Sequence, residues 1–161
     1  MKFYLLAAAL LLGACHVRTR DPGEDRAEIH ALLLDYGHTL DARDFDGFAK
    51  LFAKDGVYVT GAGKGVSGKD AGEAMRKTFA ENALGFRSPN FHMFFNEVIT
   101  LDSPDHAHAS SMSFYVVPDE HDRPTPALMA RYDDELVRED GHWKFAKRVV
   151  QSLIPAPPKA Q

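Results

Sequence analysis

In the first half of the chain, hydrophobic residues recur every three or four positions, which is typical of helices with one buried side. The clearest series predicts a helix over residues 24–42, and its members are Ile29, Leu32, Leu33, Tyr36 and Leu40. Asp44 is a suitable cap for a second, short helix with aromatic residues on its buried side. A third helix is predicted over residues 69–84, after a short strand at 57–60 and a glycine-rich turn.

The second half of the chain changes to an alternation of apolar and polar residues, which is typical of strands. Four strands are predicted, over residues 90–101, 107–117, 126–139 and 142–153. Turn-forming Asp, Pro and Gly separate them, and the Asp-Gly pair before the last strand is a hairpin signal. The order indicates an α+β fold in which three N-terminal helices pack on a curved antiparallel sheet. Such a fold is cone-shaped, and its apolar interior is a natural small-molecule site.

The first residues, MKFYLLAAALLLGAC, combine a lysine, an apolar run and small residues, and they predict a signal peptide over residues 1–14. Leu-Gly-Ala before the only cysteine, Cys15, resembles the bacterial lipobox, so lipidation of Cys15 and attachment to a membrane are expected. An ordinary signal peptide that is cut elsewhere is the alternative. His16, rather than Asp, follows the cysteine, which favours the outer membrane facing the periplasm.

Composition supports one folded domain between two polar ends. Residues 15–23 are interpreted as a lipidated tether, 24–154 as the domain and 155–161 as a disordered, proline-rich tail. The 161 residues are 45% hydrophobic and 26% charged, as in ordinary globular proteins. The formal net charge of −4 provides no basic surface for nucleic acid, so no nucleic-acid partner is expected.

Four stretches of the domain carry a family resemblance: LDARDFDGFAKLFAKDGVY, GVSGKDAG, NFHMFFNEV and RYDDELVREDGHWKFAKR. Together they resemble the SnoaL-like branch of the nuclear transport factor two-like superfamily, over residues 24–152. Its members include polyketide cyclases, scytalone dehydratase and a hexachlorocyclohexane dehydrochlorinase. The resemblance implies the cone-shaped fold, but this fold hosts isomerases, lyases, cyclases and non-catalytic binders, so it leaves the reaction open.

The resemblance also implies a pair of catalytic residues, Asp41 and His92. In the lyase members, an Asp ends the first helix and a His points into the cone from the strand after the third helix. Asp41 would orient His92, which would act as a general base toward a C–H proton of a bound apolar molecule. No cofactor and no metal are expected. In the alternative interpretation, Asp41 is a solvated turn residue and His92 is a buried histidine bonded to a backbone carbonyl.

Further pocket residues follow from strand geometry and from the resemblance. On a regular strand His92, Phe94 and Asn96 share one face, and this His-x-x-x-Asn spacing resembles that of the dehydrochlorinase-like members. The resemblance places Met112 where scytalone dehydratase has a second pocket histidine. Because several of that enzyme's polar groups are missing here, dehydration of its substrate is not expected. The predicted substrate-binding residues are Tyr58, Phe94, Asn96, Met112 and Tyr132.

Three functions remain open from the sequence. The first is a membrane-tethered domain that binds a small apolar molecule and acts as a cofactor-independent lyase or isomerase. The second is a non-catalytic ligand-binding or interaction lipoprotein of the cell envelope. In the third, the outer face of the sheet forms a homodimer. His92 beside Asp41 in a dry cone favours chemistry, whereas a cone filled by aromatic residues and Met112 favours a structural role.

Overall fold

A computed structural model describes residues 21–154, so the predicted signal peptide, Cys15 and the predicted tail lie outside the described residues. The three helices are α1 (Pro22–Asp41), α2 (Phe45–Lys50) and α3 (Gly68–Glu81). The six strands are β1 (Phe52–Val59), β2 (Gly65–Ser67), β3 (Phe91–Leu101), β4 (His106–Pro118), β5 (Pro124–Glu139) and β6 (His142–Ile154). The predicted α+β class is confirmed.

α1 begins two residues earlier than predicted, within the range interpreted as a tether. The reason is a cap: the Asp21 carboxylate accepts a hydrogen bond of 2.8 Å from the Gly23 backbone N–H, and Pro22 occupies the first turn. The predicted apolar stripe of α1 is buried against the sheet. The helix ends at Asp41, close to the predicted boundary.

The segment after α1 follows its predicted order, with shifted boundaries. Asp44 caps α2 as predicted, because its carboxylate accepts from the Gly47 backbone N–H at 2.8 Å. β1 begins at Phe52 rather than at residue 57, so residues 54–56 lie inside the strand. α3 ends before Asn82, whose left-handed backbone (φ +39°) stops the helix earlier than predicted.

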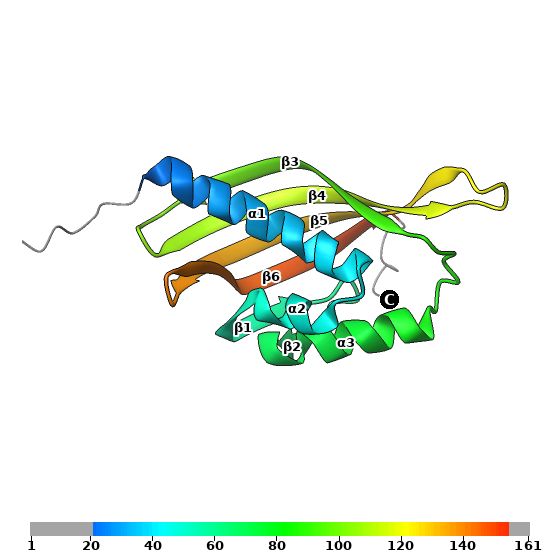
Figure 1. Ribbon diagram of the computed structural model, residues 1–161, viewed down its shortest axis with the longest axis horizontal. Coiled ribbons are helices and arrows are strands. Elements are labelled where there is room, and N and C mark those ends of the chain that lie inside the picture. Colours follow the sequence, from blue (N-terminus) through cyan, green and yellow to red (C-terminus); the bar gives the residue numbers. More distant parts are fainter. Residues whose placement is uncertain (1–20, 155–161) are drawn as a thin grey trace, which may run out of the picture.

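The strands form one curved sheet in the order β2-β1-β6-β5-β4-β3 (Figure 1). β3 to β6 form the predicted antiparallel meander, whereas β1 pairs with β6 in parallel. α1 lies across the meander, and α2 and α3 gather at the β1 end of the sheet (Figure 1). The face of the sheet under α1 is called the inner face here, and the opposite face the outer face.

Two irregularities decide which side chains reach the inner face. One is a bulge in β3 between Phe95 and Val98, and the other is a bulge in β6 after Phe145. A bulge inserts an extra residue, so the alternation of inward and outward side chains changes parity beyond it. As a result Arg148, rather than Lys147, follows Phe145 on the buried face of β6.

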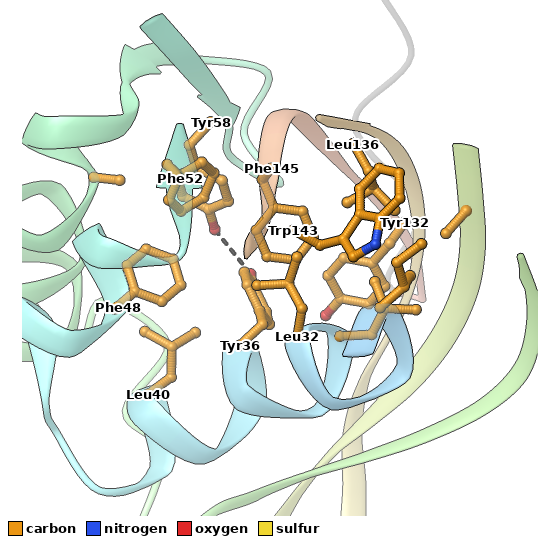
Figure 2. Close-up of a cluster of buried hydrophobic side chains, with 14 of the residues drawn as sticks. Leu32, Tyr36, Leu40, Phe48, Phe52, Tyr58, Tyr132, Leu136, Trp143 and Phe145 are labelled. Carbon is orange, nitrogen blue, oxygen red and sulfur yellow. Dashed lines mark hydrogen bonds between the residues drawn. The ribbon is translucent and has the colours of Figure 1, made fainter. Parts of the chain in front are cut away.

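Aromatic side chains fill the space between α1 and the inner face. Figure 2 shows Tyr36 at the centre of this cluster, where its hydroxyl hydrogen-bonds the Tyr58 hydroxyl at 3.0 Å. The Tyr36 ring also lies 5.2 Å from the Phe48 ring and 5.4 Å from the Tyr132 ring, measured between centroids. The space between α1 and the inner face is therefore a packed core.

Candidate functional site

Asp41 and His92 form a hydrogen-bonded pair at the C-terminal end of α1. The His92 Nδ1 lies 2.7 Å from the Asp41 Oδ1, and the His92 backbone N–H donates to the Asp41 Oδ2 at 2.9 Å. The His92 side chain is only 11% exposed and that of Asp41 only 17%. The predicted proximity of the two residues is confirmed. The alternative of a solvated Asp41 and a His92 bonded to a backbone carbonyl does not fit these contacts.

A glycine in α1 allows this close approach of helix and strand. A Cβ atom on Gly37, one turn before Asp41, would lie 2.7 Å from the Phe94 Cε2 and 3.0 Å from the His92 Cβ. Real Cβ atoms do not approach other atoms so closely, so any larger residue would force β3 away from α1. Gly37 thus sets the separation at which the Asp41 carboxylate reaches His92.

The hydrogen-bonding pattern determines which nitrogen of His92 carries the proton. An ionised carboxylate only accepts hydrogen bonds, so Nδ1 is protonated in the neutral ring and Nε2 has a free lone pair. Within residues 21–154, no hydrogen bond to Nε2 is formed. An imidazole that is oriented by a carboxylate and has an unused acceptor nitrogen has the arrangement of a general base.

Aromatic rings surround the His92 imidazole. The Tyr115 ring centroid lies 4.9 Å from that of His92, and Phe94 stacks almost parallel to it at 6.1 Å with an interplanar angle of 18°. Tyr36 presents its edge, also at 6.1 Å. The His92 imidazole is thus enclosed on several sides by aromatic rings.

Arg43, two residues after Asp41, is not among the residues predicted for the site. Its guanidinium donates to the Leu40 carbonyl and to the Asn90 Oδ1, both at 2.7 Å, and lies 4.1 Å from the centre of the Phe79 ring. A cation here satisfies the last carbonyls of α1 and opposes the negative end of the helix dipole. An arginine just after a predicted helix end was the available signal.

Tyr115 was also missed, because its place depends on strand register. It is the direct cross-strand neighbour of His92. Burial raises the pKa of Tyr115 to about 12, although the nearby positive charge of Arg43 opposes the shift. The phenol therefore remains protonated at neutral pH and retains an O–H donor.

Of the predicted substrate-binding residues, Phe94 lies beside His92, whereas Tyr58 and Tyr132 lie deeper in the core. The Tyr132 hydroxyl is 2.9 Å from the Ser113 Oγ, and the Tyr58 hydroxyl is bonded to Tyr36. Burial raises the pKa of Tyr58 to about 12 and also raises that of Tyr132. Both tyrosines are therefore neutral core groups whose hydroxyls already have partners.

The predicted placement of Asn96 and Met112 at the pocket is wrong. Asn96 lies in the β3 bulge with a φ of +53°, so it does not share the face of His92 and Phe94. Its side-chain amide instead lies 3.8 Å from the Met112 Sδ. Met112 alternates with two buried serines, Ser111 and Ser113, and therefore points to the outer face.

The space between α1 and the inner face also contains a charge pair that the sequence did not predict, Arg148 and Asp134. Arg148 is completely buried, and its Nε lies 3.6 Å from the Asp134 Oδ1. The guanidinium lies 4.0, 4.3 and 4.6 Å from the ring centres of Tyr36, Tyr132 and Phe145. Burial raises the pKa of Asp134 to about 6, against the lowering effect of Arg148.

Two other features of residues 21–154 bear on the class of site. No group of three or more His, Cys, Asp or Glu side chains there is arranged to hold a metal ion. The described helices also include none that is long and apolar enough to cross a membrane. A second Asp–His pair links the turn before β4 to the start of that strand. The His108 Nδ1 is 2.5 Å from the Asp102 Oδ2, and His108 is largely exposed.

Comparison with known proteins identifies the family. The model of the SnoaL-like domain matches residues 22–149. The uncharacterised protein Rv2910c of Mycobacterium tuberculosis is 29% identical over 126 residues, which cover 78% of this chain and 83% of that protein. Among solved structures, a scytalone dehydratase-like protein of Novosphingobium aromaticivorans is 25% identical, with a TM-score of 0.64 over 80% of this chain and 84% of that chain.

Aln2 from a Streptomyces species is 21% identical, with a TM-score of 0.69 over 83% of this chain and 93% of its own. A protein of Nostoc punctiforme with a cystatin-like fold is 22% identical, with a TM-score of 0.68 over 83% of this chain and 95% of its own. At this identity the two structures bear on the fold alone, and they agree with the curved sheet and the helices described above. The chain belongs to the SnoaL-like domain family.

Proposed function

We propose that the protein binds a small apolar molecule beside Asp41 and His92 and acts on it as a cofactor-independent lyase or isomerase. The observation that carries the proposal is the contact of 2.7 Å between the His92 Nδ1 and the Asp41 Oδ1. Within residues 21–154, the Nε2 of the same ring forms no hydrogen bond. The structural similarity to a scytalone dehydratase-like protein agrees with this class of chemistry.

The chemistry requires one proton transfer. Nε2 of His92 takes a proton from a C–H group of the bound molecule, and the electron pair of that bond moves into a new carbon–carbon double bond. In a lyase, a leaving group departs from the next carbon with its bonding electrons. In an isomerase, the π pair of a neighbouring double bond shifts to its far carbon, and the imidazolium returns the proton to that carbon. Asp41 stabilises the imidazolium that forms in either case.

The proposal is tested on the full chain by mass spectrometry of the molecule that co-purifies with it. Incubation in D2O should increase the mass of that molecule, because a proton removed by His92 exchanges with solvent. His92→Ala should abolish the exchange. His108→Ala is the matched control, since His108 also pairs through Nδ1 with an aspartate but is exposed. Equal exchange with wild type and His92→Ala would refute the assignment of the base.

A non-catalytic ligand binder is the second candidate. The observation in its favour is the filled core, where Arg148, Tyr36 and Tyr132 occupy the deep part of the cone. Such a protein would retain its co-purifying molecule without any exchange in D2O, both in the wild type and in His92→Ala. The same experiment therefore separates the two candidates.

The proposal includes export and attachment to the outer membrane through a lipidated Cys15, facing the periplasm. The lipobox-like sequence before Cys15 supports this, since acyl chains on that residue would anchor the domain to a bilayer. Cys15→Ser should move the protein from the membrane fraction to the soluble fraction and prevent incorporation of labelled palmitate. Unchanged fractionation of Cys15→Ser would contradict the anchor.

A homodimer through the outer face of the sheet is also proposed. Three large side chains of the edge strand β3 support it, because Phe91, Met93 and Val98 are 53%, 58% and 60% exposed. Sedimentation of the wild type should show a dimer, and Met93→Asp should shift it toward the monomer. A wild type that sediments as a monomer at high concentration would rule this out.

A further inference from the structure

Residues 82–90 connect α3 to β3 at the end of the molecule where α1 stops (Figure 1). Most of this connection is exposed, and the Leu84 residue within it is 64% exposed. Among these nine residues only Phe86 and Asn90 have part or most of their surface buried. A segment with so few buried contacts opens at a lower cost in free energy than the core does.

The first half of the connection is a turn that is closed by its own side chain. The Asn82 amide nitrogen donates to the Phe86 carbonyl at 3.0 Å, and the Asn82 Oδ1 accepts from the Phe86 backbone N–H at 2.9 Å. Asn82 and Gly85 both have a left-handed backbone, with φ of +39° and +65°. Because these bonds lie within residues 82–86, the turn keeps its shape when its contacts with the rest of the molecule change.

Phe86 shields the rings beside the candidate base. Its ring centroid lies 5.5 Å from that of Tyr115, which in turn lies 4.9 Å from that of His92. At the far end of the connection, Asn90 is held by the Arg43 guanidinium at 2.7 Å. The connection is thus fixed at Asn90 and covers the site through Phe86.

Arg87 ties the connection to the turn between β4 and β5. Its guanidinium donates to the Asp119 carbonyl and, at 2.7 Å, to the Asp122 Oδ1. The turn presents these acceptors in a fixed arrangement, because the Asp119 carboxylate accepts from the backbone N–H groups of His121 at 2.8 Å and Arg123 at 2.9 Å. The side chains of Arg87 and Asp122 are 51% and 79% exposed. Exposed ion pairs stabilise a structure only weakly, which suits a contact that breaks and re-forms.

We propose that residues 82–90 form a lid that controls access to His92, and that Arg87 latches this lid closed on the β4–β5 turn. The inference rests on the proposed function and adds the control of access to the same site. Release of Arg87 frees the lid to turn, which lifts the Phe86 ring from Tyr115 and opens a path to the imidazole.

The test measures how fast diethylpyrocarbonate modifies His92 in the full chain. The reagent adds a carbethoxy group to an unprotonated imidazole nitrogen, and mass spectrometry quantifies the modified peptide. The reaction requires access to Nε2, because Nδ1 is held by Asp41 at 2.7 Å. His108 is the internal reference, since its Nδ1 is paired with Asp102 in the same way while its side chain is 64% exposed. In the wild type, His92 should react much more slowly than His108.

Removal of the latch should speed the reaction. Arg87→Ala should raise the rate at His92 about fivefold to tenfold, the increase in the open population expected when one charge-assisted contact is lost. Asp122→Asn should raise it by a smaller factor, because the Asp119 carbonyl still accepts from Arg87. Asparagine tolerates the left-handed backbone at this position (φ +59°). The double variant should react no faster than Arg87→Ala, since both changes act on one contact.

A matched control and the salt dependence separate the latch from a general effect of removing an arginine. Arg131→Ala should leave the rate at His92 unchanged, because Arg131 is 53% exposed and pairs with Asp133 of its own strand. Salt screens exposed charges, so about 0.5 M NaCl should speed the reaction of the wild type but not that of Arg87→Ala.

The lid is overturned if His92 reacts as fast as His108 in the wild type, or if Arg87→Ala leaves its rate unchanged. It is also overturned if every histidine of Arg87→Ala reacts faster, since that result reports a loosened fold. Latch-dependent modification without His92-dependent exchange in D2O supports the lid and counts only against the base. Exchange in D2O with unchanged modification overturns the lid and leaves the base in place.

Discussion

Arg148 and Asp134 form an ion pair that is shielded from water between α1 and the inner face of the sheet, with 3.6 Å between Nε and Oδ1. Within residues 21–154, neither charged group forms a side-chain hydrogen bond. The guanidinium is instead enclosed by aromatic rings, the closest being that of Tyr36 at 4.0 Å. Cation–π contacts with these rings compensate part of the lost hydration. The positive charge of Arg148 therefore favours the ionised form of the Asp134 carboxyl, whereas burial of that carboxyl opposes it.

Arg148→Met should destabilise the fold by about 3–5 kcal/mol at pH 7, because it leaves the Asp134 carboxylate buried without a countercharge. The double variant Arg148→Met/Asp134→Leu should recover most of this loss, since an apolar pair has no desolvation cost. Urea unfolding measures both changes in the free energy of unfolding. A double variant that is no more stable than Arg148→Met would show that packing of the guanidinium, rather than its charge, is what matters.

Asp134 should also give the fold a characteristic dependence on pH. Burial raises its pKa from 3.8 to about 6, so between these values the folded chain binds a proton that the unfolded chain has released. The contribution of Asp134 to stability is thus greatest below about pH 4 and falls by up to about 3 kcal/mol as the pH rises past 6.

The measurement compares the free energy of unfolding of the wild type and Asp134→Asn at several pH values from about 4 to about 7.5. The variant lacks the titrating group, so the difference between the two proteins isolates its contribution. The stability of the wild type relative to the variant should decline across this range. A difference that is constant with pH would mean that the carboxylate titrates normally.

The sequence predicts the helices and the meander well because their apolar periodicity is uninterrupted. The stripe of α1 from Ile29 to Leu40 is buried as expected. Alternation along strands is a weaker guide, because one inserted residue reverses it. The bulge in β3 turns Asn96 away from His92, and the bulge in β6 turns Arg148 into the core. No local signal in either strand marks these positions.

The residues of the candidate site were likewise predicted only in part. Asp41 and His92 were found because a family resemblance pointed to them, and the fold brings them together. Tyr115 belongs to no stretch of sequence that suggests chemistry, and the signal for Arg43 is only its place just after a predicted helix end. Tyr115 reaches His92 only through the register of β3 and β4, which is set by long-range pairing. The position of Arg43 depends on the residue at which α1 ends.

The His92 tautomer provides a direct test of the Asp41 contact. Because the carboxylate accepts from Nδ1, the neutral ring should be protonated at Nδ1 and bare at Nε2. Long-range proton–nitrogen NMR spectra distinguish the two nitrogens, and comparison with His92→Gln assigns the signals. In Asp41→Asn the preference for one tautomer should weaken. A wild-type ring protonated at Nε2 would remove the free lone pair on which the base depends.

Gly37 should tolerate no larger side chain, although alanine is normally the better helix former. Gly37→Ala should destabilise the fold by about 1–3 kcal/mol, because the added methyl group meets Phe94 at 2.7 Å in a packed interior. Helix propensity alone predicts the opposite sign, a gain of about 0.5–1 kcal/mol. Gly65→Ala is the matched control, because no heavy atom lies within 4 Å of its added Cβ.

The control should change stability by less than about 0.5 kcal/mol. Gly37→Ala should also reduce the tautomer preference of His92, since moving β3 away from α1 lengthens the contact with Asp41. Urea unfolding and the imidazole NMR signals measure the two effects on the same samples. A stabilising Gly37→Ala with unchanged His92 signals would show that the added Cβ does not meet the Phe94 ring at 2.7 Å. The separation that brings Asp41 to His92 would then not depend on the glycine.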